Sequence, residues 1–354
     1  NLNDDPNRFI VFTSGLFDHV SFIKGAEGDL AFASDQTKYH LDNQWHDPPV
    51  FDYFLVNLKD GSRTPVATRE TPRSISPDGK YIYWYSQLDT NWYCHNISAG
   101  TTVNLTAKLG VSFDNPDVDS PNGLHHYGGP TWLGEDECML IPDRYDIWKL
   151  DPDGKSAVCL TKGEGRRKGL QFRVMGLDAL EDSHWYQQIR HRPLKGSIRL
   201  SVFDENTMEY GFGRMNTAAP AVPEYFTEPV MFKGVSKVEG NDLIAYQKGD
   251  FRHPYDVYIT RDFFTSSDKL TAVNPQMSQY LWGDAHLVSW TAYDGTPLKG
   301  ILYTPENLDP NGSYPMVVYF YEKNTQNLFS PSSPAPSRSV INYAYYVSNG
   351  YVVF

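Results

Sequence analysis

One sequence unit returns five times along the chain and restricts the folds open to it. Each copy has an aromatic or aliphatic run, a polar turn and a second short run. The first runs end at Leu58, Ile97, Leu150, Phe203 and Ile259. A repeat of about 40 to 55 residues with several short strands is typical of a β-propeller blade. A β-sandwich or another all-β array is the alternative, but a sandwich does not need the same unit to return five times.

Other features of the first 285 residues agree with β-structure. Further hairpin patterns with Gly, Asp or Asn turns begin at Arg73, Gly129 and Ser236. Aromatic residues make up 14% of the chain, with 24 Tyr and 8 Trp, a composition that favours strands. We expect the tryptophans of these strands to pack between blades rather than line a ligand funnel; they are Trp84, Trp92, Trp132 and Trp148.

Charge and cysteine content exclude several classes of function. The formal net charge of −12 disfavours nucleic acid as a partner. The one dense basic cluster, Arg-Arg-Lys at 166–168, is interpreted as a solvated loop. Three cysteines without C-x-x-C spacing predict neither a disulfide framework nor a zinc site. No apolar run approaches the roughly 20 residues that a membrane-spanning helix needs.

Two motifs resemble metal sites, but each has a simpler interpretation. His125 and His126 are adjacent, so on a strand they would point to opposite faces. The acidic run at 114–123 resembles a calcium loop, but Pro121 occupies a ligand position and Gly123 falls one place late. We therefore expect a turn or interface role for the histidines, a solvated loop for the acidic run, and neither a metal nor a cofactor.

The pattern changes after Trp282. The segments are a hairpin at 286–305 with an Asp294-Gly295 turn, the apolar run MVVYFY at 316–321, a helix at 339–349 ended by Gly350, and a strand at 351–354. The apolar run predicts a strand buried on both faces. The helix would carry Ile341, Tyr345 and Ser348 on one face. Strand, helix and strand in this order predict a β-α-β unit and hence a second domain, so we divide the chain into 1–285 and 286–354.

Several of these motifs together resemble the prolyl-oligopeptidase family of serine peptidases. They are SPDGKYI from Ser76, YDIWKLDP from Tyr145, LTKGEGR from Leu160, DGTPLKGILYTPENLDPNGSYPMVVYFYEK from Asp294 and SNGYVVF from Ser348. Their order is similar to that of the dipeptidyl-peptidase-IV-like branch, especially its bacterial members, over nearly the whole chain. The resemblance implies a mainly β fold, an incomplete β-propeller followed by the first β-α-β elements of an α/β-hydrolase domain. It also implies a Ser-Asp-His triad between the two domains, a peptide substrate and, by resemblance only, a soluble protein with a periplasmic or extracellular location.

The nucleophile of that family is not evident in the sequence. A G-x-S-x-G elbow is required to lift the serine above the sheet, and the nearest matches, around Ser112 and Ser236, lack its final glycine. We therefore expect the triad beyond Phe354, further blades before Asn1, and no hydrolase activity from this chain alone. This branch holds the N-terminal amine of its substrate with paired glutamates, and the sequence contains no Glu-Glu pair. We therefore do not assign the substrate specificity of that branch to this chain.

Tyr321 is the one residue of this chain to which the resemblance gives a catalytic role. In the dipeptidyl-peptidase-IV-like branch a tyrosine after "YP" and a buried strand helps to hold the oxyanion, and Tyr314-Pro315 precedes Tyr321 at the matching distance. The alternatives are that Tyr321 only packs against the neighbouring helix, or that the register is off by one and points to Phe320. For the whole chain, the alternative functions are a non-catalytic propeller interaction module and a propeller glycosidase. An open arc of blades would also expose strand edges and favour a homo-oligomer.

Overall fold

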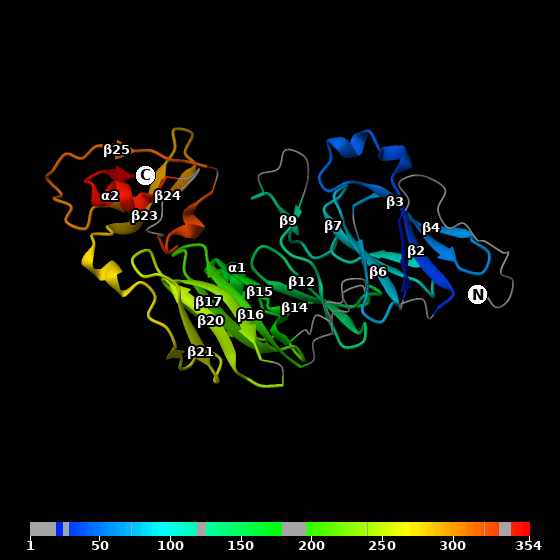
Figure 1. Ribbon diagram of the computed structural model, residues 1–354. Coiled ribbons are helices and arrows are strands. Elements are labelled where there is room, and N and C mark those ends of the chain that lie inside the picture. The colour runs from blue at the N-terminus through cyan, green and yellow to red at the C-terminus, as the bar shows by residue number, and fades with distance from the viewer. Residues whose placement is uncertain are drawn as a thin grey trace, which may run out of the picture. The chain divides into compact units, whose positions relative to one another are not determined.

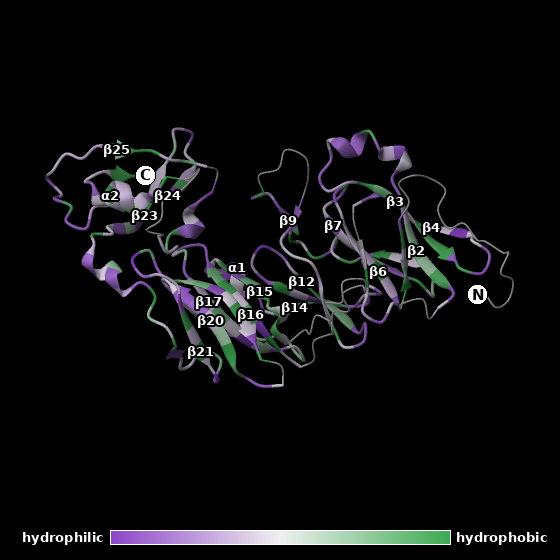
Figure 2. Cartoon of the chain, in the orientation of Figure 1, coloured by the Kyte–Doolittle hydropathy of each residue, from purple (hydrophilic) through white to green (hydrophobic). Residues whose placement is uncertain are grey.

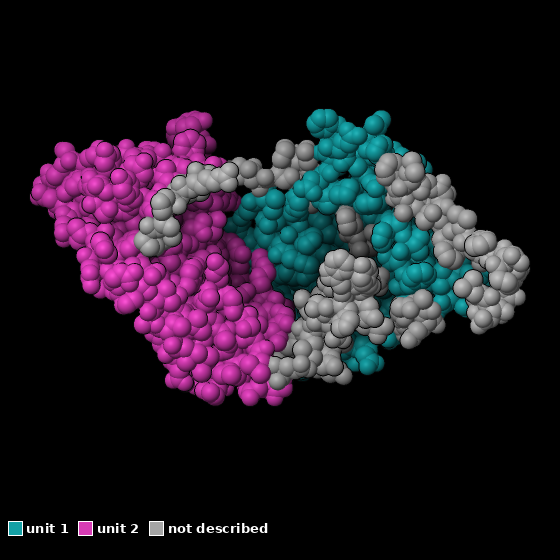
Figure 3. All heavy atoms as spheres, viewed as in Figure 1, with its two compact units in different colours: residues 1–164, 179–198, 216–222 teal, residues 165–178, 199–215, 223–354 magenta. Residues whose placement is uncertain are grey.

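The computed structural model of the chain is built mainly from β-sheets (Figure 1). It describes residues 19–23, 28–71, 73–118, 125–178, 196–238, 240–321, 323–332 and 341–354. Contacts divide the chain into two compact units (Figure 3). Unit 1 comprises residues 1–164, 179–198 and 216–222, and unit 2 comprises residues 165–178, 199–215 and 223–354. The predicted domain boundary at 285 is not tested by this division and stays a prediction.

Unit 1 contains three four-stranded antiparallel sheets whose strands follow one another in sequence order. The first has β1 (His19–Phe22), β2 (Leu30–Asp35), β3 (Phe51–Asn57) and β4 (Arg63–Glu70). The second has β5 (Arg73–Ile75), β6 (Tyr81–Ser86), β7 (Asn91–Asn96) and β8 (Thr101–Asn104). The third has β11 (Thr131–Leu133), β12 (Cys138–Pro142), β13 (Ile147–Leu150) and β14 (Ala157–Cys159). A separate two-stranded ribbon pairs β9 (Asp114–Asn115) with β10 (His125–His126).

Two more sheets of the same order lie almost wholly in unit 2. The fourth has β15 (Leu170–Val174), β16 (Ser197–Asp204), β17 (Tyr210–Asn216) and β18 (Glu224–Glu228). The fifth has β19 (Met231–Lys237), β20 (Ile244–Gly249), β21 (Asp256–Thr260) and β22 (Asp268–Lys269). Five consecutive four-stranded meanders are propeller blades, so the fold class predicted from the repeat is confirmed.

The repeated unit is the last hairpin of its blade in four cases out of five. Leu58, Ile97, Leu150 and Ile259 lie at the ends of the third strands, β3, β7, β13 and β21. Phe203 instead lies in β16, the second strand of its blade. The repeat at Phe203 therefore corresponds to a different hairpin of its blade. Successive hairpins of a meander have the same local sequence pattern, and only the pairing order of the strands distinguishes them.

The helices are short. They are α1 (Glu164–Lys168), α2 (Tyr343–Ser348) and the 3-10 helices η2 (Thr37–Tyr39), η3 (Asp42–Gln44), η4 (Gly176–Asp178), η5 (Pro275–Gln279) and η6 (Thr325–Asn327). The basic cluster at 166–168 thus ends a helical turn rather than forming a loop. Across the described ranges, no helix has the length and apolarity required to cross a bilayer.

Aromatic and aliphatic side chains of neighbouring blades form the cores of unit 1, and Figure 2 shows the hydrophobic residues concentrated along the strands. Trp84 packs with Tyr53 and Phe32 of the first blade. Trp92 packs with Trp132 of the third blade. These three tryptophans are nearly fully buried, and Trp148 is partly buried against the same core as Trp92 and Trp132. The predicted role of the four tryptophans in packing between blades is therefore confirmed.

The Ser-Pro-Asp-Gly-Lys turn from Ser76 links the second blade to the third. Gly79 has φ +74°, a left-handed conformation that glycine adopts without steric cost. The Ser76 hydroxyl donates to Asp136 Oδ2 at 2.5 Å and accepts from the backbone N–H of Tyr81 at 3.0 Å. The turn motif therefore has a structural function in addition to reversing the chain.

The last sheet, here called the C-terminal sheet, is mixed and has the order β23-β24-β26-β25. Its strands are β23 (Asp284–Thr291), β24 (Pro297–Thr304), β25 (Met316–Val317) and β26 (Val352–Val353). β23 and β24 form the predicted antiparallel hairpin, while β25 and β26 are parallel and are connected through α2. The predicted β-α-β unit is confirmed.

Two details of that unit differ from the sequence prediction. The helix begins at Tyr343, where the Asn342 side chain accepts from the N–H of Tyr345, and the part of the prediction at 339–340 lies outside the described residues. Its buried residues are Ala344 and Val347, whereas Tyr345 is 64% exposed. The helix packs on the sheet through Val347, in a core cluster with Val353 of β26. Ile341 precedes the helix, and Tyr345 and Ser348 lie on its exposed side.

The run MVVYFY is not buried on both faces. Only Met316 and Val317 are in the strand, and the exposed fractions of Met316, Val318 and Phe320 are 57%, 58% and 82%. These three residues alternate along the chain and so share one face, which the described residues leave exposed, whereas Val317 on the other face packs in the core cluster of the sheet. β25 has β26 as its only neighbour among the described strands.

Candidate functional site

Tyr321, the residue predicted to stabilise an oxyanion, lies just beyond the edge strand of the C-terminal sheet. The N–H of Phe354 donates to the Val317 carbonyl at 2.9 Å, and the N–H of Tyr319 donates to the Phe354 carbonyl at 2.8 Å. Strand-like pairing therefore continues to Tyr319, two residues before Tyr321. The Tyr321 side chain is 69% exposed, as a donor to a bound substrate must be. Its catalytic role stays a prediction.

Tyr319 and Tyr321 are neighbours in space. Their ring centroids are 5.6 Å apart with an interplanar angle of 66°, which agrees with the shared face expected from strand alternation. The side chain from α2 in this region, Tyr343, contacts the Tyr319 ring at 6.1 Å. Among the described residues, the ring contact of Tyr321 is thus with Tyr319, and the ring contact of Tyr343 in α2 is with Tyr319 rather than with Tyr321.

A row of tyrosines connects this edge to the core. The Tyr343 ring stacks on the Tyr303 ring at 4.4 Å with an interplanar angle of 7°. Tyr303 is only 6% exposed, and burial raises its pKa. Burial, followed by interactions with Tyr321, also raises the pKa of Tyr319. These phenols are therefore neutral near pH 7, when they can donate hydrogen bonds.

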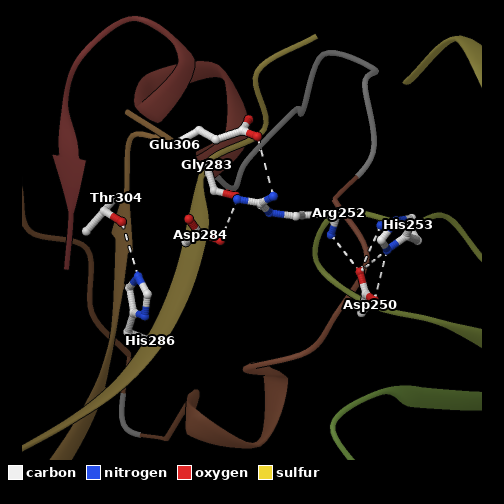
Figure 4. Close-up of polar contacts among 8 residues, drawn as sticks. All are labelled: Asp250, Arg252, His253, Gly283, Asp284, His286, Thr304 and Glu306. Atoms are coloured by element: carbon white, nitrogen blue, oxygen red, sulfur yellow. Dashed lines mark hydrogen bonds and ion pairs between the residues drawn. The ribbon is translucent and has the colours of Figure 1, made fainter. Parts of the chain in front are cut away.

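Arg252, in the turn between β20 and β21, connects the fifth blade to the C-terminal sheet (Figure 4). Its Nε donates to the Gly283 carbonyl at 3.0 Å, and its Nη2 lies 2.6 Å from Asp284 Oδ1. Its Nη1 lies 3.4 Å from Glu306 Oε1. One guanidinium thus contacts the first strand of the sheet and the segment that follows its second strand. The sequence does not reveal this contact, because Arg252 belongs to no motif and its partners are more than thirty residues away.

A cavity of about 580 Å³ lies beside Arg252. Its charged lining residues are paired: Lys248 lies 3.1 Å from Glu228, and Lys269 lies 2.5 Å from Asp256. Trp282 and Met277 add apolar surface. Because these charges are neutralised by one another, the cavity does not indicate a charged ligand.

Neither near-match serine has the surroundings of a nucleophile. The Ser112 hydroxyl accepts from the N–H of Asp114 at 3.1 Å, and Ser236 is exposed on β19. Among the described residues, neither serine hydrogen-bonds to a histidine, which a serine nucleophile needs as its base.

The two histidines form β10 of the short ribbon. The His126 ring lies 4.8 Å from Trp92 and 5.4 Å from Tyr85, and burial lowers its pKa. Within the described ranges, no group of three or more His, Cys, Asp or Glu could hold a metal ion. Part of the calcium-like run, residues 119–123, lies outside those ranges.

Comparisons with known proteins define the fold further. No family model and no curated protein sequence matches the chain. Over 94% of its length the chain is similar to a solved protein from Bacteroides ovatus ATCC 8483 assigned as a dipeptidyl aminopeptidase IV, with 13% identity and a TM-score of 0.56. The match covers 51% of that protein.

Two other solved structures match more weakly. A post-proline cleaving enzyme from Rickettsia typhi has 12% identity over 96% of this chain and 47% of its own, with a TM-score of 0.49. A puromycin hydrolase has 14% identity over 95% of this chain and 49% of its own, with a TM-score of 0.47. These two similarities are too weak to support an argument. The chain spans about half the length of these three proteins. At 13% identity, the likeness to the Bacteroides protein confirms the family resemblance at the level of the fold.

Proposed function

We propose that the chain is the propeller portion and the first part of the hydrolase domain of a prolyl-oligopeptidase-family serine peptidase. The supporting observation is the order of its parts, five four-stranded blades followed by a parallel β-α-β unit, which matches the Bacteroides protein over 94% of the chain. A peptide is the substrate, and a Ser-Asp-His triad outside residues 1–354 cleaves it. The family resemblance favours a periplasmic or extracellular location.

Tyr321 has the oxyanion role in this proposal. A neutral hydroxyl fixed near the end of the strand donates to the negative charge that develops in the transition state. Losing one such donor typically lowers the rate about 100- to 1000-fold. The exposure of Tyr321 and its contact with a second phenol support this role.

The alternative functions have less support. A propeller that only binds other proteins does not need a β-α-β unit after its blades. A glycosidase needs two carboxylates about 5 to 10 Å apart across a bond, and the carboxylates beside the cavity, Asp256 and Glu306, are engaged by Lys269 and Arg252.

The test compares this chain with the longer protein that the proposal requires. Both are incubated with fluorogenic proline-containing peptides and with a fluorophosphonate, and the labelled serine is mapped by mass spectrometry. We expect hydrolysis and labelling of one serine outside residues 1–354 in the longer protein, and neither in this chain. Labelling of Ser112 or Ser236, or a longer protein that neither cleaves peptides nor is labelled, would contradict the proposal.

A further inference from the structure

Among the described residues, the ring contact of Tyr321 is with Tyr319. It lies two residues beyond the last strand-like hydrogen bond and is 69% exposed. A donor accelerates a reaction only when it is already aimed at the position where charge develops. A freely rotating tyrosine at an exposed edge would have to be ordered at each turnover. Some neighbouring group must therefore position it.

We propose that Tyr319 is the positioning residue for Tyr321: its hydroxyl donates to the Tyr321 oxygen, and its ring fixes the Tyr321 ring. This inference rests on the proposed function. The Tyr321 proton then cannot point at Tyr319 and is left for the oxyanion. Tyr319 does not touch the substrate and acts only through Tyr321.

The contact between the two phenols has two parts. The rings lie edge to face at 5.6 Å, a geometry in which aromatic pairs attract. Burial and then the neighbouring Tyr321 raise the pKa of Tyr319, which favours its protonated form. A protonated Tyr319 supplies the donor, and a phenol oxygen that accepts one hydrogen bond becomes a better donor in the next.

Tyr319 can position a neighbour because it is itself fixed at two points. Its N–H donates to the Phe354 carbonyl at 2.8 Å, which ties its backbone to the end of β26. Its ring meets Tyr343 edge to face, and Tyr343 stacks on the buried Tyr303. Tyr319, Tyr343 and Tyr303 thus form a row of ring contacts that connects Tyr321 to the core of the C-terminal sheet.

The contact is tested on this chain, independently of catalysis. Tyrosine labelled with ¹³C at Cζ gives one NMR signal per residue, assigned with single Tyr→Phe variants. Because Tyr321 contributes to the raised pKa of Tyr319, Tyr321→Phe should move the Tyr319 titration to lower pH. Tyr345→Phe, on the exposed side of α2, should leave it unchanged. An unchanged Tyr319 titration in Tyr321→Phe would overturn the inference.

The catalytic half is tested in the longer protein. Tyr319→Phe keeps the ring and loses the hydroxyl, so kcat should fall about threefold to tenfold with KM unchanged, while Tyr319→Leu, which also loses the ring, should cost more. The double variant Tyr319→Phe/Tyr321→Phe should be no slower than Tyr321→Phe, and Tyr345→Phe should match the parent. Losses that multiply in the double variant would overturn the positioning role.

The outcomes separate this inference from the function on which it rests. A longer protein that cleaves peptides with full kcat after Tyr321→Phe would overturn the inference and leave the peptidase proposal intact. A longer protein without peptidase activity would overturn the proposed function and the catalytic role of Tyr319. The NMR titration would still test the contact between Tyr319 and Tyr321.

Discussion

Asp136 is a buried residue of the third blade that accepts hydrogen bonds from the Ser76 turn of the second blade. It is 4% exposed and accepts from the Ser76 hydroxyl at 2.5 Å and from the N–H groups of Asp78 and Lys80 at 2.9 and 3.1 Å. Asp136→Asn keeps the shape and tolerates the φ of +60°, but it turns an NH₂ group towards these donors. We expect the free energy of unfolding, measured with urea, to fall by about 1–3 kcal/mol. Glu135→Gln, at the adjacent exposed position, is the control, and equal losses in both variants would contradict the prediction.

Asp52 should make the first blade sensitive to acid. Burial raises the pKa of this carboxyl, but hydrogen bonds from Lys38 at 2.7 Å, Tyr39 at 2.6 Å and the Arg69 N–H at 3.1 Å outweigh it, so the pKa is lowered overall. A carboxyl whose pKa is lower in the folded state stabilises the fold above its unfolded pKa of about 4, and this contribution is lost as the pH falls through the folded value. Asp52→Asn should therefore be less stable than the parent chain at pH 7, with a difference that shrinks below about pH 4. Urea unfolding at several pH values measures this, and a difference independent of pH would refute it.

Among the elements, the C-terminal sheet depends on a close backbone approach where β23 begins. Gly283 has φ +77°, and a Cβ there would overlap the Thr304 carbonyl oxygen and the Val347 side chain. Gly295, in the hairpin turn, has φ +89° but open space around it. Gly295→Ala should cost about 1–2 kcal/mol from the left-handed backbone alone, and Gly283→Ala should cost clearly more because the backbone must also move. Thermal unfolding of the two variants measures their losses of stability, and the difference between them gives the cost of the steric overlap beyond that of the backbone strain. Equal losses would show that the sheet relaxes around the added methyl group.

The elements that sequence predicts well are those specified by local chemistry. Turns such as Ser76 to Gly79 and Asp294-Gly295 carry their own signal, so the hairpins on both sides of them were placed correctly. The position of a strand in its sheet is a tertiary property. For that reason the apolar run after Met316 was expected inside the sheet and lies at its edge, and Phe203 was aligned with the wrong hairpin.

Of the residues at the candidate site, the sequence predicts Tyr321 but not the residues around it. Tyr321 was found through a family pattern in the residues before it. The stack of Tyr343 on Tyr303 and the contacts of Arg252 join segments far apart in the chain, and no spacing rule predicts which distant residues meet. The sequence therefore predicts a site residue, Tyr321, and not the distant residues that contact its surroundings.

For the molecule as a whole, the exposed edge of β25 is the feature with the largest consequence. Met316, Val318 and Phe320 are each more than half exposed beside a strand edge with no described partner. Such an edge pairs readily with another chain. The net charge of −12 opposes association through repulsion, which salt screens.

We therefore expect the chain to self-associate through this edge, and more strongly at high salt. In sedimentation velocity, the weight-average sedimentation coefficient should rise with protein concentration, and more steeply in about 0.5 M than in about 0.05 M salt, where the screening length is several times longer. Phe320→Lys and Val318→Lys place a charge at the edge and should restore a monomer. Tyr293→Lys is the matched control, because Tyr293 is fully exposed at the tip of the β23–β24 hairpin, away from β25. A chain that stays monomeric at both salt concentrations, or an equal effect of Tyr293→Lys, would show that the edge is blocked or that association uses another surface.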